Sequence, residues 1–296
     1  MKRVIASVCA AALALSMVAC GSDASTSTST STGSESGAST SITVVPREDG
    51  SGTRSAFVEL TGVETDEGDM TIATAQVANS TNNVMTSVQA EPSAIGYISM
   101  GSLNETVKGI AVDGVEPTTD NVKAGTYPIS RPFNIVTKGD ISAQDELTQD
   151  FVNWVMSADG QAICTEEGYI GDDAAEAYTS TQPSGSLAVG GSSSVSPVME
   201  KLIETYMADV NPNASIDLQT TDSTNGVTGA LDGTYNIGMA SRAISDDEAS
   251  QGAVSTQLAM DGIAVIVNTE NAVSNISMDS LRGIYTGEVT DWADVQ

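Results

Sequence analysis

The chain has 296 residues, and its 11 lysines and arginines stand against 39 aspartates and glutamates, giving a formal net charge of −28 at pH 7. It contains no histidine and three cysteines, which excludes Ser-His-Asp and Cys-His catalysis, histidine-ligated zinc and a thiolate metal cage. The acidity argues against nucleic acid as a partner, because a phosphate backbone needs a basic surface. Hydrophobic residues make up 40% of the chain, which is enough for a substantial core.

The first forty residues predict targeting and a tether. Lys2 and Arg3 precede an apolar stretch that is too short for a membrane span, which is typical of a signal peptide over residues 1–19. The small residues before Cys20 resemble a bacterial lipobox, which implies cleavage there, lipidation of the Cys20 sulfur and attachment to the membrane. Ordinary signal cleavage near the same place is the alternative. Residues 20–40 are rich in Ser and Thr and predict a lipid-anchored, flexible tether.

From residue 42 onward, strand-like and helix-like patterns alternate, which predicts an α/β fold with mainly parallel sheets. The expected strands cover residues 42–45, 94–98, 133–136, 187–189, 215–219, 236–240 and 262–267, and the expected helices cover residues 54–60, 147–155, 197–210, 227–231 and 278–285. Residues 171–186 are rich in Asp, Ala, Ser, Thr, Gly and Pro and predict an internal linker. Trp154 and Cys164 are expected in the core.

Three short segments share one design, because each follows an expected strand and opens an expected helix. They are residues 47–54, 190–197 and 221–226, and each is rich in small residues and hydroxyls. Free N–H groups and the positive end of a helix dipole suit an oxyanion, and Arg47 could add a bidentate fork. Ordinary helix capping explains any one of them. Three of them at the carboxyl ends of strands indicate an anion site. The absence of P-loop and G-x-G-x-x-G patterns argues against nucleotide binding.

The sequence VPREDGSGTRSAF at residues 45–57 resembles the signature of the phosphate-binding lipoproteins of bacterial phosphate ABC importers, the PstS-type family. Similar segments extend the resemblance over residues 41–170 and 187–296; they are residues 94–97, 160–169, 191–197, 236–242, 261–268 and 284–292. The resemblance implies a two-lobe, periplasmic-binding-protein-like (type II) α/β fold whose lobes close on the ligand about a hinge. It also implies an extracytoplasmic, lipid-anchored receptor, not an enzyme and without a cofactor or metal. Such a receptor captures inorganic phosphate and delivers it to the permease subunits of an ABC importer.

The order of these segments departs from the family, because its amino-terminal Gly-Ser-Ser-Ser-Val turn here follows the Arg-x-Asp-Gly-Ser-Gly-Thr motif. We therefore expect a circularly permuted chain, with residues 171–186 joining the family's original ends. One lobe would then combine residues 41–128 with 269–296, and the other would be continuous over residues 129–268. A truncated tandem duplication and a swapped dimer are the alternatives.

The resemblance also assigns site residues. The residues that match phosphate contacts are Arg47, Ser51, Gly52, Thr53, Ser193, Ser194, Ser223 and Ser241. Asp49 matches the acid that orients the arginine. Ser241 is followed by Arg242 where the best-known members have an anion-contacting aspartate, so Asp261 is expected to act as the acceptor instead. A buried carboxylate can accept the proton of phosphate but repels sulfate, which carries none.

Three other functions remain open from the sequence. The chain could be a non-transport surface sensor of phosphate or an adhesin, or the same fold could bind another oxyanion. A hydrolase using Ser51 or Ser193 is disfavoured, because neither serine has a histidine or a Ser-x-x-Lys partner that could serve as its base.

Overall fold

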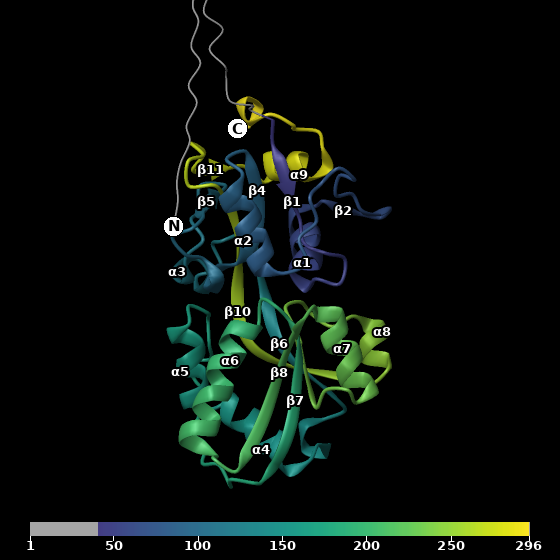
Figure 1. Ribbon diagram of the computed structural model, residues 1–296, viewed down its shortest axis with the longest axis vertical. Coiled ribbons are helices and arrows are strands. Elements are labelled where there is room, and N and C mark those ends of the chain that lie inside the picture. The colour runs from purple at the N-terminus through teal and green to yellow at the C-terminus, as the bar shows by residue number, and fades with distance from the viewer. Residues whose placement is uncertain (1–40, 296) are drawn as a thin grey trace, which may run out of the picture. The chain divides into compact units, whose positions relative to one another are not determined.

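The computed structural model describes residues 41–295, so the expected signal peptide (1–19), the lipidation site Cys20 and the tether (20–40) lie outside the described residues. The main sheet has the strand order β1-β4-β10-β6-β9-β7-β8, and β5 pairs with β10 and β11 (Figure 1). The strands are β1 Thr43–Val45, β4 Ala94–Ser99, β5 Lys108–Val112, β6 Ser130–Lys138, β7 Gly185–Ser192, β8 Ala214–Thr221, β9 Ile237–Ala240, β10 Ala253–Val267 and β11 Asn275–Ile276. A separate two-stranded sheet joins β2 (Glu64–Thr65) and β3 (Gly68–Asp69).

Helices follow most of these strands. They are α1 Gly52–Thr61, α2 Thr81–Ala90, α3 Thr119–Lys123, α4 Glu146–Val155, α5 Ala158–Glu166, α6 Ser196–Thr205, α7 Ser223–Asp232, α8 Asp246–Ser250 and α9 Met278–Thr286. A π-helical turn, Tyr206–Val210, continues α6, and short 3₁₀ turns cover Met100–Ser102, Ile141–Ala143 and Trp292–Asp294. Between residues 41 and 295, no helix has the length and apolar character that crossing a membrane would need.

Two large hydrophobic cores define two lobes. The first lobe, residues 41–129 and 263–295, buries side chains of β1, β4, β5, α1, α2, α9 and the last part of β10. The second lobe, residues 130–262, buries side chains of β6, β7, β9, α4, α5 and α6. Trp154 is 2% exposed in this second core, as expected. Cys164 is fully buried in the same core, and burial raises the pKa of its thiol to about 12. Cys164 therefore acts as a small apolar residue.

Strand β10 belongs to both lobes (Figure 1). Residues 253–262 pair with β6, and residues 263–267 pair with β4 and β5. The expected lobe boundary at residue 268 differs from this pairing, because the strand changes partners between Gly262 and Ile263. The segment that enters β6 and the middle of β10 are therefore the two connections between the lobes.

The sheet is mixed, so the expectation of mainly parallel pairing is wrong. Strand β10 runs antiparallel to β4, β5 and β6, and β6 runs antiparallel to β9. Parallel pairing joins β1 to β4, β5 to β11, and β7 to both β8 and β9. The alternation of strands and helices predicts the parallel units correctly, but the long strands that pass between the lobes reverse direction relative to them.

The expected linker, residues 171–186, packs on the second lobe. Asp150 of α4 is 1% exposed and accepts hydrogen bonds from the Tyr178 hydroxyl (3.0 Å), the Ser180 hydroxyl (2.6 Å) and the Thr181 backbone N–H (2.8 Å). The Tyr206 hydroxyl donates to the same carboxylate at 2.6 Å. This segment is therefore tied to the lobe through one buried acid, and β7 begins within its last residues, at Gly185.

The two ends of the described chain lie side by side. The Ile42 backbone N–H donates to the Thr290 carbonyl at 2.8 Å, and Ser41 forms an antiparallel bridge with Asp291. The strand that begins the first lobe therefore starts next to the segment that ends it.

Candidate anion-binding site

Several helices begin at one place between the lobes. Ser51 caps α1 by accepting from the Arg54 N–H (3.3 Å), and Asp222 caps α7 by accepting from the Asn225 N–H (2.8 Å). Helix α6 begins after the turn at residues 192–195, with Pro197 in its first turn. These are the three segments that the sequence analysis selected. The N–H groups at a helix amino terminus carry partial positive charge, which favours an anion nearby.

Hydroxyl groups from both lobes meet here in what we call the hydroxyl cluster, which consists of Thr53, Thr81, Ser192, Ser193, Ser194, Ser223 and Ser241. Their residues are at most 8% exposed. Thr53 and Thr81 of the first lobe contact Ser194 of the second lobe, with oxygens 2.9 and 3.2 Å apart. Ser241 contacts Ser192 at 3.0 Å and Ser223 at 3.3 Å. Hydroxyls that bond to one another can rotate to donate together to an anion.

Gly52 allows this close approach. A Cβ added at Gly52 would collide with the Ser223 hydroxyl and lie 2.9 Å from the Ser241 hydroxyl. The first turn of α1 therefore reaches the second lobe's serines only because residue 52 has no side chain.

Arg47 supplies a buried cation beside the cluster. It is 2% exposed, and its guanidinium donates to the Ser193 hydroxyl at 3.0 Å and to Thr81 at 3.4 Å. Its Nε and Nη2 atoms each donate to a different oxygen of Glu48 at 2.7 Å. The backbone N–H of Arg47 donates to the Tyr97 hydroxyl at 3.1 Å. The guanidinium is therefore fixed on one side by a carboxylate and faces the hydroxyls on the other.

The expectation that Asp49 orients Arg47 is wrong. The Asp49 side chain is 96% exposed and pairs with Arg54 at 2.7 Å. Residues 49 and 50 form a turn after β1, which directs the Asp49 side chain outward. Glu48, one residue earlier, holds Arg47 instead. Spacing in the sequence alone does not reveal which of two adjacent acids faces inward.

Asp261 contacts Arg131 and Ser99. Its Oδ2 accepts from Arg131 Nη2 (3.1 Å) and Nε (3.3 Å), and its Oδ1 accepts from the Ser99 hydroxyl (2.9 Å). Burial raises the pKa of Asp261 to about 6, although Arg131 and the hydrogen bonds oppose the shift. Arg131 Nη1 donates to the Ser241 carbonyl at 3.2 Å. Asp261 is thus connected to the hydroxyl cluster through Arg131.

The structure brings most of the expected residues together. Arg47, Thr53, Ser193, Ser194, Ser223 and Ser241 share hydrogen bonds within the cluster, Gly52 packs on it, and Ser51 caps the adjoining helix. Arg242 turns away and pairs with Glu248 at 2.7 Å.

Sequence reasoning missed Glu48, Thr81, Ser99, Arg131 and Ser192. Thr81 follows the cap Ser80 at the start of α2, a capping signal that could have been found. Arg131 lies within a strand, where no sequence pattern distinguishes it.

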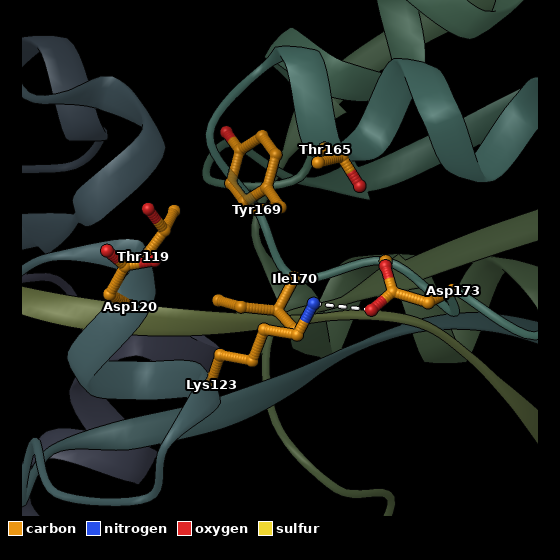
Figure 2. Close-up of a pocket in the computed structure, with 8 residues that line it drawn as sticks. Thr119, Asp120, Lys123, Thr165, Tyr169, Ile170 and Asp173 are labelled. Atoms are coloured by element: carbon orange, nitrogen blue, oxygen red, sulfur yellow. Dashed lines mark hydrogen bonds and ion pairs between the residues drawn. The ribbon is translucent and has the colours of Figure 1, made fainter.

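Two cavities lie near these elements. One of about 210 Å³ is lined by Thr81 and Ser193 of the cluster together with Ser102, Ser196 and Glu200. The other, of about 140 Å³, lies between α3 and the end of α5, where Lys123 pairs with Asp173 and the ring of Tyr169 forms one wall (Figure 2). It contains no residue of the hydroxyl cluster. In residues 41–295, no group of three or more acids or cysteines is arranged to hold a metal ion.

The chain is similar in sequence to known proteins over most of its length. A sequence model of the PBP superfamily domain matches residues 23–159 and 176–296. The chain is 46% identical to phosphate-binding protein PstS 2 of Streptococcus agalactiae serotype V over 86% of this chain and 88% of that protein. It is 42% identical to phosphate-binding protein PstS 2 of Streptococcus pneumoniae serotype 4 over 88% of this chain and 89% of that protein.

A solved structure is also similar to this chain over most of its length. The crystal structure of a phosphate-binding protein of a phosphate ABC transporter from Streptococcus pneumoniae TIGR4 is 41% identical, with a TM-score of 0.69 over 86% of this chain and 100% of that one. The fold thus has a counterpart over most of the chain. This chain belongs to the PBP superfamily and, within it, to the family of PstS-type phosphate-binding proteins.

Proposed function

We propose that this chain is an extracytoplasmic solute-binding protein that captures inorganic phosphate between its two lobes and delivers it to an ABC-type phosphate importer. The observation that carries the proposal is the hydroxyl cluster, in which Arg47 and hydroxyls from both lobes meet at helix N-termini. Charge-assisted hydrogen bonds of this kind contribute about 1.5–3 kcal/mol each, offset by the costs of closure and desolvation. The names of the relatives support phosphate as the ligand.

The proposed phosphate contacts are Arg47, Ser51, Gly52, Thr53, Ser193, Ser194, Ser223 and Ser241, to which the geometry adds Thr81 and Ser192. Their contacts with one another support this set. The proposed direct acceptor, Asp261, has both carboxylate oxygens bonded to other groups, which favours a different role that is argued below.

The test replaces Arg47 with lysine, which keeps the charge but loses the planar fork. We expect phosphate to raise the thermal unfolding temperature of the wild-type chain, and we expect phosphate affinity to fall by about 10- to 100-fold in Arg47→Lys. Arg282→Lys, an exposed position on α9, is the matched control and should bind as the wild type does. A wild-type chain that shows no phosphate-dependent shift up to millimolar concentrations would refute the proposal.

The site of action is part of the same proposal. Lipidation of Cys20 would anchor the chain to the outer side of the cell membrane, with residues 20–40 as the lipid-anchored tether. In cells, we expect the wild-type chain in the membrane fraction and Cys20→Ser in the medium or the soluble extracytoplasmic fraction. Finding both variants in the cytoplasm would contradict this location.

The permuted order of the lobes is also proposed. The hydrogen bond between Ile42 and Thr290 supports it, because it holds two segments that are far apart along the chain side by side in the first lobe.

A further inference from the structure

The structure holds a second buried arginine–carboxylate pair beside the hydroxyl cluster, formed by Arg131 and Asp261. Arg131 is 2% exposed and Asp261 is 0% exposed, and they face each other as cross-strand neighbours on β6 and β10. These are the strands that connect the lobes, and the pair lies one residue before the point where β10 changes partners. An ion pair buried this deeply is costly, so its position beside the hydroxyl cluster calls for a functional explanation.

The contacts of Arg131 lead into the site. Its Nη1 atom donates to the carbonyl of Ser241, whose N–H and hydroxyl both contact Ser223. Arg47 is near enough to lower the pKa of Arg131 by charge repulsion, although burial is the larger cause of that lowering. The hydroxyl cluster is therefore flanked by two guanidinium groups, Arg47 with Glu48 and Arg131 with Asp261.

We propose that Arg131 is a second cation of the phosphate site and that Asp261 acts as its counterion, so the net charge of this pair sets affinity and selectivity for anions. This inference rests on the proposed phosphate-binding function. With Asp261 ionised, the pair is neutral and contributes little attraction to an anion. With Asp261 protonated, the same pair carries one positive charge at the site.

The groups around Asp261 make this charge responsive to the ligand. Arg131 faces it from β6 and Ser99 from β4, while Tyr169 after α5 and Tyr127 before β6 also lie within electrostatic reach. Burial raises the pKa of both tyrosines, so they stay neutral, and burial also raises the pKa of Asp261 to about 6. A bound anion would favour its protonation further, so anion binding should take up a proton.

The test compares Asp261→Asn with Arg131→Gln at pH 7 by calorimetric titration of phosphate and of sulfate. Asp261→Asn leaves Arg131 unbalanced, so we expect sulfate binding, which is undetectable in the wild type, to become measurable, with phosphate affinity maintained or increased. Arg131→Gln leaves a carboxylate beside the anion, so we expect phosphate affinity to fall at least tenfold. Glu248→Gln disrupts the partly buried Arg242–Glu248 pair and, as the matched control, should change neither affinity.

A pH readout separates this role from a structural one. Titrations at pH 6 in two buffers of different ionisation enthalpy give the number of protons taken up with phosphate. We expect the wild type to take up more than Asp261→Asn. If Arg131→Gln does not fold, Arg131→Lys provides the second variant, and it should bind phosphate more weakly than the wild type because it keeps the charge but loses the planar fork.

The outcomes are distinguishable from a failure of the proposed function. A wild-type chain that does not bind phosphate refutes that function. If the wild-type chain binds phosphate, two results for Asp261→Asn would overturn the counterion role. The first is a proton uptake equal to that of the wild type. The second is weaker phosphate binding, which would indicate that Asp261 accepts the phosphate proton directly.

Discussion

At the scale of single residues, adjacent acids behave differently because of the direction in which each side chain points. Glu48 and Asp49 follow one another, yet Glu48 holds the buried Arg47 and Asp49 is exposed to solvent beside Arg54. A buried charge that loses its partner is destabilising, whereas an exposed ion pair contributes little.

This difference predicts the effect of removing each acid. Glu48→Ala should lower the free energy of unfolding by about 1–3 kcal/mol, since Arg47 stays buried without its carboxylate. Asp49→Ala should change it by less than about 0.5 kcal/mol. Urea unfolding without phosphate measures both values. A larger loss in Asp49→Ala than in Glu48→Ala would show that our assignment of the arginine's partner is wrong.

Gly52 gives a second test at this scale. A Cβ at this position would collide with the Ser223 hydroxyl, so Gly52→Ala should hold the lobes apart and reduce phosphate affinity at least 100-fold. Ser55→Ala, three residues further along α1, is the control and should retain affinity within about threefold. Near-normal binding by Gly52→Ala would mean that α1 does not need to approach these serines for phosphate to bind.

At the scale of elements, the sequence predicts most helices and strands, because apolar periodicity and capping residues are local signals. Pro197 lies in the first turn of α6 as expected, whereas α1 begins two residues before its expected start at residue 54 and α7 begins four residues before its expected start at residue 227. Partners that are distant along the chain leave no such signal. Thr81 contacts Ser193 from 112 residues away, and Arg131 contacts Asp261 from 130 residues away. The family resemblance identified one side of several contacts, and the structure was needed to identify the other.

The segment before β7 provides an element-scale prediction. Burial would raise the pKa of Asp150, but hydrogen bonds from Ser180, Tyr206, Thr181 and Tyr178 outweigh it and lower the pKa. A carboxylate whose pKa is lower in the folded state than in the unfolded state stabilises the fold at pH values above its unfolded-state pKa. This stabilisation is lost as the pH falls through the folded-state pKa. Asp150→Asn should therefore cost about 2–3 kcal/mol at pH 7, and the difference from the wild type should shrink below about pH 4.

Urea unfolding at pH 7 and pH 3 measures this effect. Exposed Asp66→Asn is the control and should match the wild type at pH 7. If Asp150→Asn were as stable as the wild type at pH 7, the packing of residues 171–186 on the second lobe would not depend on this acid.

At the scale of the whole molecule, the two lobes use the chain in different ways. The second lobe is built from one continuous stretch, whereas the first combines both ends of the described chain. The contact between Ile42 and Thr290 makes those ends neighbours. A fold whose ends are adjacent tolerates joining them and opening the chain elsewhere.

A rearranged chain tests this arrangement. Joining residue 296 to residue 41 and opening the chain at Ser184, just before β7, should give a monomer that binds phosphate with an affinity within about threefold of the parent. Size-exclusion chromatography and titration check both properties. A parent chain that elutes as a dimer, or a rearranged chain that does not fold, would favour lobes completed by a second copy.

The central claim is that a hydroxyl cluster with buried arginines binds phosphate selectively. The most direct measurement is calorimetric titration of the purified chain with phosphate and then with sulfate at pH 7, after bound phosphate has been removed. Our account predicts phosphate binding at micromolar or tighter dissociation constants and no detectable sulfate binding. Equal binding of both anions would contradict the proposed selectivity, and heat from neither anion in a folded monomer would contradict the site itself.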